Sequence, residues 1–548
     1  MLDKYNQWVN SVRDKSELLE LQSFGNNIDE IKDRFYRDLE FGTGGLRGVI
    51  GLGTNRMNVY TVGRATFGLG KYLLSQNKEP KVVIAYDSRK YSFEFARLSA
   101  EILSSQGIKA YLFDTLAPTP ILSYAVRYLS ANAGIVITAS HNPKEYNGYK
   151  VYNEHGCQIT DTAASEIMGA INTYGYFTEY FPVPENIVLI GEEIISSFLN
   201  TIKSYSLFDN VSNFAPSVVY TPLHGTGNIP VKRILQDLGV KELYLVKEQE
   251  FPDHEFTTCP YPNPEEESAL TLALALAKEK EADIVLATDP DADRVGIAVK
   301  NGTNYVRLNG NETGYLLENY ILERRQQLGL LPQGATVVKT IVTGDMATSI
   351  AQSYNVAVKE VLTGFKYIGE MIDSLAKPDD YMFGLEESYG YLIGTHARDK
   401  DAVSAVMMIV EMCAYYRSQG KTLLDKLKEL YNIHGYYQTA LTTQTYKGVD
   451  GVETMKKIVQ ALRDKPIKTL CGEPVISMTD YMRNNTGLPK SNVLMFKSKN
   501  YKVVVRPSGT EPKLKTYFQV KSESNETTCK LLKNLVDCVK EILAGEQR

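Results

Sequence analysis

A unit of strand, small-residue loop, helix and second strand occurs three times along this chain of 548 residues. The first strands are predicted at Lys81–Tyr86, Ser217–Thr221 and Thr336–Val342, which are short runs rich in β-branched residues. Two strands joined through a helix form a βαβ unit, in which the strands are parallel. The wide, similar spacing of the units favours three related α/β domains in tandem, although any large α/β protein contains several such units.

The pattern changes after residue 430. Residues Tyr431–Thr445 are rich in aromatic and β-branched side chains, which predicts a strand or a hairpin. Helical stretches at Gly451–Arg463 and Thr528–Ala544 flank two strand-like runs, Asn500–Val505 and Lys513–Val520. Strands flanked by helices predict a small α+β domain.

Length and composition agree with this organisation. A chain of 548 residues suggests three or four domains, and 43% apolar with 23% charged residues is typical of a soluble globular protein. The fold expected is α/β, with three similar domains of mixed or parallel sheets and a smaller C-terminal α+β domain. The domains are expected at residues 1–205, 206–310, 311–430 and 431–548.

Several classes of protein are disfavoured by the charge, the cysteines and the N-terminus. A net charge of −5 and a pI of about 5.9 give no basic field for nucleic acid. The six cysteines include no CxxC pair, which argues against a zinc cage or a disulfide framework and for a reducing compartment. We see neither a signal-peptide core nor an apolar stretch long enough to span a bilayer. A cytoplasmic protein with no membrane partner is therefore expected, and its oligomeric state is not specified.

The strongest local signal is the acidic motif Asp289–Arg294, Asp-Pro-Asp-Ala-Asp-Arg, which follows the predicted strand Asp283–Ala287. Alternating carboxylates at the end of a buried strand can converge on one hard cation, whose charge relieves their repulsion. An EF-hand is excluded because its sixth and twelfth positions would be Arg294 and Lys300. A solvated acidic turn is the alternative, which the apolar strand disfavours. All-oxygen ligands favour Mg²⁺, with a phosphate as partner.

A reactive serine is suggested by Thr138–Pro143, Thr-Ala-Ser-His-Asn-Pro, which follows the apolar run Ala133–Ile137. Ser140 has His141 beside it and Lys150 nearby. Rigid sheets often present reactive hydroxyls on such loops. An ordinary strand exit would also contain Ser, Asn and Pro.

Four further segments carry polar groups in loops. Arg506–Pro512 has two hydroxyls, a glycine and an arginine, which suits an anion nest or a plain β-turn. Gly384–Tyr391 places two acids and a hydroxyl between glycines, which suits vicinal sugar hydroxyls. The charged run His396–Asp401 precedes a predicted apolar helix and also suits helix capping. Phe41–Gly48 is glycine-rich with one arginine but is neither a P-loop nor a dinucleotide motif, so a phosphate contact and a structural bend both remain open.

Taken together, four of these motifs resemble the α-D-phosphohexomutases, most closely the phosphoglucomutases. They are Ser-His-Asn-Pro, Asp-Pro-Asp-Ala-Asp-Arg, Gly-Leu-Glu-Glu-Ser and Arg-Pro-Ser-Gly-Thr-Glu-Pro, in that order along the chain. Glu40–Gly48 resembles the corresponding motif of the longer, phosphoglucomutase-2-like branch. The resemblance covers nearly the whole chain and implies four domains around a central cleft.

The resemblance also implies roles for individual residues. Ser140 would carry a phosphoryl group, and Asp289, Asp291 and Asp293 would bind Mg²⁺ together with it. Positions near the transfer are matched by Arg47, His141 and Lys400. Positions that contact the substrate are expected at Arg294, Thr363, Gly364, Glu386, Ser388, Arg506, Ser508, Gly509 and Thr510.

The implied activity is that of an intramolecular phosphotransferase. Phosphoserine 140 would donate its phosphoryl group to glucose 1-phosphate, and the bound glucose 1,6-bisphosphate would reorient and return the other phosphate to Ser140. Lys400 or His141 would be the base. Mannose or pentose phosphates are alternative substrates. A phosphatase of the haloacid-dehalogenase type, with Asp289 as nucleophile, is a different class, against which the third acid and Arg294 of the motif count.

Overall fold

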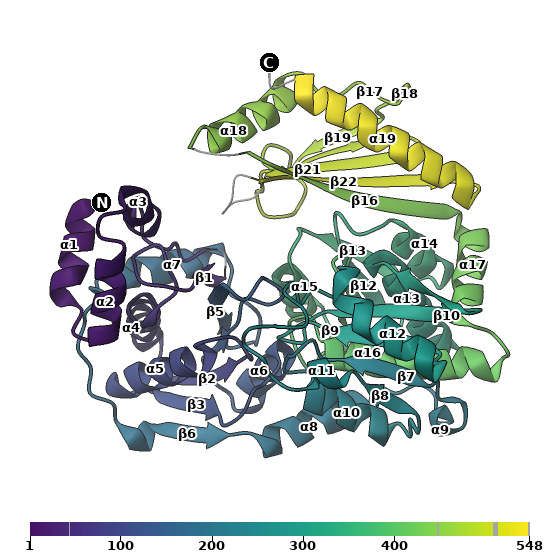
Figure 1. Cartoon of the computed structure of the whole chain (residues 1–548). Coiled ribbons are helices and arrows are strands. Elements are labelled where there is room, and N and C mark those ends of the chain that lie inside the picture. The colour runs from purple at the N-terminus through teal and green to yellow at the C-terminus, as the bar shows by residue number, and fades with distance from the viewer. Residues whose placement is uncertain (43, 447–448, 508–512, 546–548) are drawn as a thin grey trace.

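The computed structural model describes residues 1–42, 44–446, 449–507 and 513–545. Figure 1 shows the first domain beside the second and third, with the C-terminal domain lying across them. The expected α/β fold with an additional C-terminal domain is confirmed, and its sheets show how the first three domains are related.

The first sheet is built around strand β2 (Lys81–Tyr86). β2 lies parallel to β3 (Lys109–Phe113) on one side and to β4 (Ala133–Ile137) on the other. β5 (Tyr146–Asn153) returns antiparallel to β4. The edges of the sheet are β1 (Gly45–Val49) and β6 (Ile187–Ile190).

The same four-strand pattern recurs in the second and third sheets. The second contains, in order, β10 (Val295–Asn301), β9 (Ile284–Thr288), β7 (Val218–Thr221) and β8 (Leu243–Leu245), with β11 (Asn304–Leu308) beyond β10. The third contains β15 (Gly390–Leu392), β14 (Tyr381–Glu386), β12 (Thr336–Thr340) and β13 (Ala357–Val361). In both sheets three parallel strands are followed by one antiparallel strand, as in the first. The predicted repeat of α/β domains is therefore present in the strand order as well.

Equivalent connections in the three sheets carry the predicted chemical groups. The chain leaves the third parallel strand at its carboxyl end and turns into the antiparallel strand, through residues 138–145, 289–294 and 387–389. Each connection contains one non-glycine residue with a left-handed backbone: Ser140 (φ 53°), Ala292 (φ 50°) and Tyr389 (φ 64°). Ligand sites of open α/β sheets lie at this carboxyl edge.

Helices cover the sheets and join the domains. In the first domain they are α4 (Val59–Gln76), α5 (Ser92–Ser105), α6 (Thr119–Tyr128), α7 (Asp161–Ile171) and α8 (Glu192–Lys203). In the second and third they include α10 (Asn228–Asp237), α12 (Thr271–Lys280), α13 (Gly310–Gln327), α14 (Met346–Ser353), α15 (Phe365–Ser374) and α16 (Ala402–Ser418). Residues 402–416 of α16 are all buried, within an apolar core that contains side chains of all three domains. Among the described residues we find no helix with both the length and the apolar character to cross a membrane.

The C-terminal domain is an antiparallel sheet under two helices. Its strands, in order, are β16 (Tyr436–Thr445), β22 (Lys513–Ser522), β21 (Tyr501–Pro507), β20 (Leu494–Lys497) and β19 (Ser477–Asp480). Helices α18 (Val449–Asp464) and α19 (Asn525–Gly545) lie on the side of the sheet that faces away from the other domains (Figure 1).

Two strand predictions at domain junctions were wrong in part. Residues 431–434 end helix α17 (Leu423–His434), because Leu423, Leu427 and Tyr431 continue an apolar helical spacing, and the rest is one strand rather than a hairpin. Strand β12 ends at Thr340, and Ile341 and Val342 pack instead against the C-terminal domain.

Three helices before the first sheet form a separate aromatic core. They are α1 (Leu2–Ser11), α2 (Lys15–Ser23) and α3 (Ile28–Phe35). Trp8 is 1% exposed and contacts the rings of Phe35, Tyr60, Tyr176 and Phe177. A buried aromatic cluster of this kind stabilises the attachment of the helices to α4 and to the segment after α7.

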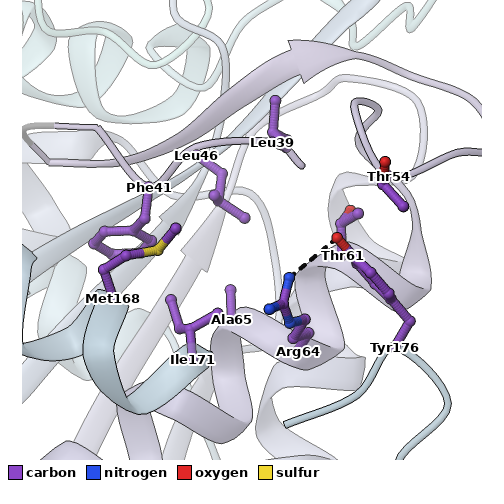
Figure 2. A pocket seen from close by; sticks show the side chains of 10 residues that line it. All are labelled: Leu39, Phe41, Leu46, Thr54, Thr61, Arg64, Ala65, Met168, Ile171 and Tyr176. Atoms are coloured by element: carbon purple, nitrogen blue, oxygen red, sulfur yellow. Dashed lines mark hydrogen bonds between the residues drawn. The ribbon is translucent and has the colours of Figure 1, made fainter. Parts of the chain in front are cut away.

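A small cavity lies between β1 and helices α4 and α7 (Figure 2). Its volume is about 20 Å³, and Phe41, Leu46 and Met168 line one side. Arg64 closes the other side by donating a hydrogen bond of 3.0 Å to the Tyr176 hydroxyl. A space of this size holds about one water molecule, so it is a packing gap behind β1 and not a ligand site.

Candidate active site

Ser140 joins the first two domains. Its side chain is almost fully buried, and its Oγ donates a hydrogen bond of 2.9 Å to Oδ2 of Asp289. Nδ1 of His141 lies 3.4 Å from the Ser140 Oγ. The left-handed backbone of Ser140 is uncommon for a residue with a side chain, and its N–H donates to Oγ1 of Thr138 at 2.8 Å. The loop therefore holds the hydroxyl in a single direction, toward the acidic motif.

Arg89, which was not predicted as a site residue, binds the loop that carries Ser140. Its guanidinium donates to the carbonyl oxygens of Ser140, Asn142, Pro143 (2.8 Å) and Tyr146 (3.2 Å). It also pairs with the Asp87 carboxylate at 3.3 Å, and both side chains are fully buried. Five donors in a planar fork suit a loop that turns several carbonyls toward one point.

The three acids of the predicted metal motif converge. One carboxylate oxygen from each of Asp289, Asp291 and Asp293 lies within 4.8 Å of the others, and all three residues are buried. Oδ1 of Asp291 and Oδ1 of Asp293 have no hydrogen-bond partner among the described residues. Buried carboxylate oxygens without partners are unfavourable unless a cation binds them. The donor set therefore fits a hard divalent cation.

Two lysines balance part of this negative charge. Nζ of Lys150 lies 2.8 Å from Oδ2 of Asp291, and Nζ of Lys400 lies 3.2 Å from Oδ2 of Asp293. Burial and the neighbouring acids raise the pKa of Asp289. Although burial opposes it, Lys150 holds the pKa of Asp291 below its usual value. Ser140 thus faces a carboxyl group that shares one buried acidic pocket with Asp291 and Asp293.

The two candidate bases differ in charge. Burial would lower the pKa of Lys400, but Asp293, Asp399 and Glu386 raise it, so Lys400 is a cation here. Burial and the charges of Arg294 and Arg47 hold the pKa of His141 well below its usual value, so its imidazole is neutral.

The alternative of helix capping for residues 396–401 is correct for one residue. Asp401 caps α16 by accepting from the N–H of Val403 at 2.8 Å, and it also pairs with His396. Asp399 instead accepts from Nζ of Lys400 at 3.0 Å and from the Tyr152 hydroxyl at 2.8 Å.

The third domain contributes an acidic loop, Glu386 and Glu387, near Lys400. Glu386 ends β14 and accepts a hydrogen bond of 2.8 Å from the N–H of Gly364, so the two predicted substrate loops lie in contact. Oγ1 of Thr363 is buried without a partner among the described residues, and Ser388 is half-buried in the turn after β14. Burial and Glu386 raise the pKa of Glu387 to about 7.

The arginines of the predicted site come from three domains. Arg294 pairs with Glu265 at 2.5 Å. Arg47 lies on β1, where its Cα is paired with that of Gly148, and its side chain is exposed. Arg506 lies near the end of β21, paired in register with Lys515 of β22. Ser508, Gly509 and Thr510 fall outside the described residues, so their predicted roles stay predictions.

Lys515 is a further basic residue, next to Arg506, that the sequence analysis did not identify as part of the site. Burial, Arg506 and Arg294 lower its pKa, while Glu387 and Glu265 raise it. These influences place Lys515 among the charged groups of the second and third domains. Its position opposite Arg506 on the next strand was the available signal, because residues paired across a hairpin lie on the same face of the sheet.

Comparison with known families agrees with this architecture. The descriptions of phosphoglucomutase/phosphomannomutase α/β/α domains I, II and III match residues 38–176, 196–302 and 309–434, and that of the C-terminal domain matches residues 454–531. A phosphoglucomutase of Staphylococcus haemolyticus is 37% identical over 521 residues, covering 92% of this chain and 94% of its own. One from Staphylococcus epidermidis is 36% identical over 539 residues, covering 94% and 96%.

Solved structures share the fold. A putative phosphomannomutase from Thermus thermophilus superimposes with a TM-score of 0.73 at 23% identity, covering 93% of this chain and 99% of that one. The pp63/parafusin phosphoglucomutase of Paramecium gives a TM-score of 0.69 at 16% identity, covering 93% and 95%. The chain belongs to the phosphoglucomutase/phosphomannomutase family, which confirms the predicted class of enzyme.

We expect the protein stripped of metal by a chelator to be stabilised by Mg²⁺. At a hundred times its dissociation constant the ion should add about 2.7 kcal/mol to the free energy of unfolding, seen as a higher melting temperature in scanning calorimetry. Asp291→Asn should lose most of this increase, because it replaces a charged carboxylate of the buried acid triad by a neutral amide.

Glu279→Gln serves as the control, since Glu279 is an exposed acid on α12 of the same domain. An equal stabilisation of wild type and Asp291→Asn by Mg²⁺ would contradict the assignment.

Proposed function

We propose that this protein is a phosphoglucomutase, which interconverts α-D-glucose 1-phosphate and glucose 6-phosphate through a phosphoserine at Ser140 and a glucose 1,6-bisphosphate intermediate. The observation that carries the proposal is the contact of the Ser140 hydroxyl with Asp289, where the equivalent connections of two domains meet beside Lys150 and Lys400. Membership of the family and the staphylococcal phosphoglucomutases support it.

Charge neutralisation is the main contribution of the site to phosphoryl transfer. A phosphoryl group on Ser140 Oγ brings further negative charge to a pocket that holds three acids, so cations must surround it. Arg47 and Lys400 are proposed to contact the transferring oxygens, and Lys150 balances Asp291. Asp289, Asp291 and Asp293 are proposed to hold Mg²⁺ together with the phosphoserine, and the ion when bound supplies further positive charge to the phosphoryl oxygens.

Sugar recognition is assigned to the third domain. Glu386 and Ser388 are proposed to bind hydroxyls of the glucose ring, with Thr363 and Gly364 beside them. Arg294 is proposed to border the same space, because, although burial opposes it, Glu265 and more weakly Glu386 raise the pKa of Arg294.

Phosphate recognition is assigned to the C-terminal domain. Arg506 and Lys515 are proposed to bind the phosphate that is not being transferred, and the predicted anion nest at Ser508, Gly509 and Thr510 would complete this contact. Holding that phosphate positions the opposite end of the sugar for the reaction at Ser140.

Proton transfer is proposed to use both candidate bases in different roles. His141 is neutral and its Nδ1 lies 3.4 Å from Ser140 Oγ, so it can take the serine proton when the phosphoryl group returns. Lys400 is a cation and is proposed to stabilise negative charge and, in that same step, to donate a proton to the sugar oxygen that loses its phosphoryl group.

All six cysteines are free, which supports a cytoplasmic location as part of the proposal.

The intact mass of the purified protein should show a fraction heavier by one phosphoryl group. Peptide mapping should place that group on Ser140. Ser140→Ala should lose the modification and reduce turnover by roughly 10⁶-fold, as expected when a nucleophile is removed. Ser388→Ala, which changes only the proposed sugar loop, should keep the modification. A phosphoryl group on Asp289 would instead indicate a haloacid-dehalogenase-like phosphatase.

Lys400→Met should lower kcat by about 10² to 10³, the usual effect of losing one group that stabilises transition-state charge. Lys144→Met is the matched control, because Lys144 lies in the Ser140 connection but pairs with Glu255 at the surface, at 2.7 Å. A kcat for Lys400→Met within about twofold of wild type in steady-state assays would exclude the assigned role.

A further inference from the structure

A cluster of four charged side chains, two buried lysines and two partly exposed acids, lies between the third and the C-terminal domains. Lys339 on β12 pairs with Asp345 and with Glu360 of β13, each at 2.9 Å. Lys502 on β21 of the C-terminal domain pairs with the same Asp345 oxygen at 2.7 Å. The Lys339 side chain is fully buried and that of Lys502 is 5% exposed, so water screens neither pair well.

The contact with Asp345 is directional. Gln519 of β22 accepts from the backbone N–H of Asp345 at 2.8 Å and donates to its Oδ2 at 3.2 Å. Lys502 also donates to the carbonyl oxygen of Thr343 at 3.3 Å. Two neighbouring strands of the C-terminal domain thus bind one loop of the third domain through both backbone and side-chain atoms.

This loop, residues 341–345 between β12 and α14, is called the Asp345 loop, and it connects the two halves of the proposed substrate site. On one side, the Thr343 and Thr340 hydroxyls donate to Oε2 of Glu387 at 3.3 and 3.4 Å. On the other, Lys502 and Gln519 are paired in register on β21 and β22, the strands that carry Arg506 and Lys515 farther along. The Asp345 loop therefore contacts both the acidic sugar loop and the hairpin that carries the proposed phosphate cations.

The charges are not needed merely to hold the two domains together. Ile341, Val342 and Leu362 of the third domain pack against Val504 and Tyr517 of the C-terminal domain in the same interface. Burial and Lys339 lower the pKa of Lys502 to about 8, which Asp345 only partly opposes. A buried ammonium is thus unfavourable here, whereas apolar contacts stabilise without fixing a direction.

We propose that the contact of Lys502 and Gln519 with Asp345 is a positioning contact, which sets the orientation of the C-terminal domain so that Arg506 and Lys515 meet the sugar phosphate. The inference rests on the phosphate-binding role proposed above. Lys502 and Gln519 act through the hairpin and do not touch substrate.

Lys502→Met tests the proposal, because methionine is similar in length and leaves Asp345 paired with Lys339. Without the ionic contact the competent orientation is less populated, and apparent affinity falls with that population. We expect KM for glucose 1-phosphate to rise about tenfold, while kcat changes less than about threefold and the melting temperature is unchanged or higher. Hydrogen exchange of β21 and β22 should become faster.

Two further variants sharpen the test. Gln519→Met should give the same selective rise in KM, and it stands in if Lys502→Met does not fold. Lys499→Met is the control, since Lys499 is exposed in the turn before β21, and it should behave as wild type. Unchanged KM and unchanged hydrogen exchange in both test variants would overturn the inference.

Failure of the underlying function would look different. If wild type itself does not turn over glucose 1-phosphate, the proposed function fails. Hydrogen exchange of β21 and β22 then decides the positioning contact alone: faster exchange in Lys502→Met supports it, and unchanged exchange overturns it.

Discussion

The hydrogen bond from Ser140 to Asp289 is the contact on which the rest of the site depends. It spans two domains, and it exists only because each partner is presented at the carboxyl edge of its own sheet. Arg89 shapes the serine loop by binding its carbonyl groups, and Lys150 crosses to Asp291 from the strand that follows that loop. A shift of either domain would separate the Ser140 hydroxyl from the three acids that could hold a metal ion beside it.

Repetition of one sheet pattern explains how distant segments meet. In each of the first three domains the connection after the third parallel strand carries candidate site groups: the Ser140 hydroxyl, the acids of the Asp289–Asp293 motif, and Glu387 with Ser388 directly after Glu386. The loops after the first parallel strands have supporting roles. Arg89 lies in the first such loop and binds the serine connection, while Asp345 lies in the third and binds the C-terminal domain. The same topology therefore places the proposed reacting groups in one set of loops and residues that bind neighbouring segments in the other.

The sequence predicted the groups that follow strands, because alternating acids or a Ser-His pair after an apolar run is visible locally. Ser140, Asp289 and Glu386 were found in this way. Arg89 and Lys502 were not, since their importance comes from partners more than fifty residues away that only the folded chain brings near. Residues 431–434 were predicted as strand although they end helix α17, because aromatic residues suit either a strand or a helix until their spacing is counted.

The most direct test of the account follows a radiolabelled phosphoryl group on Ser140. When unlabelled glucose 1-phosphate is added to the labelled protein in a single turnover, we expect the label to leave the protein and to appear first in glucose 1,6-bisphosphate. It should do so without release of inorganic phosphate, since the proposed function passes the group between sugar and serine. Label appearing mainly as inorganic phosphate, or remaining on the protein, would contradict the central claim.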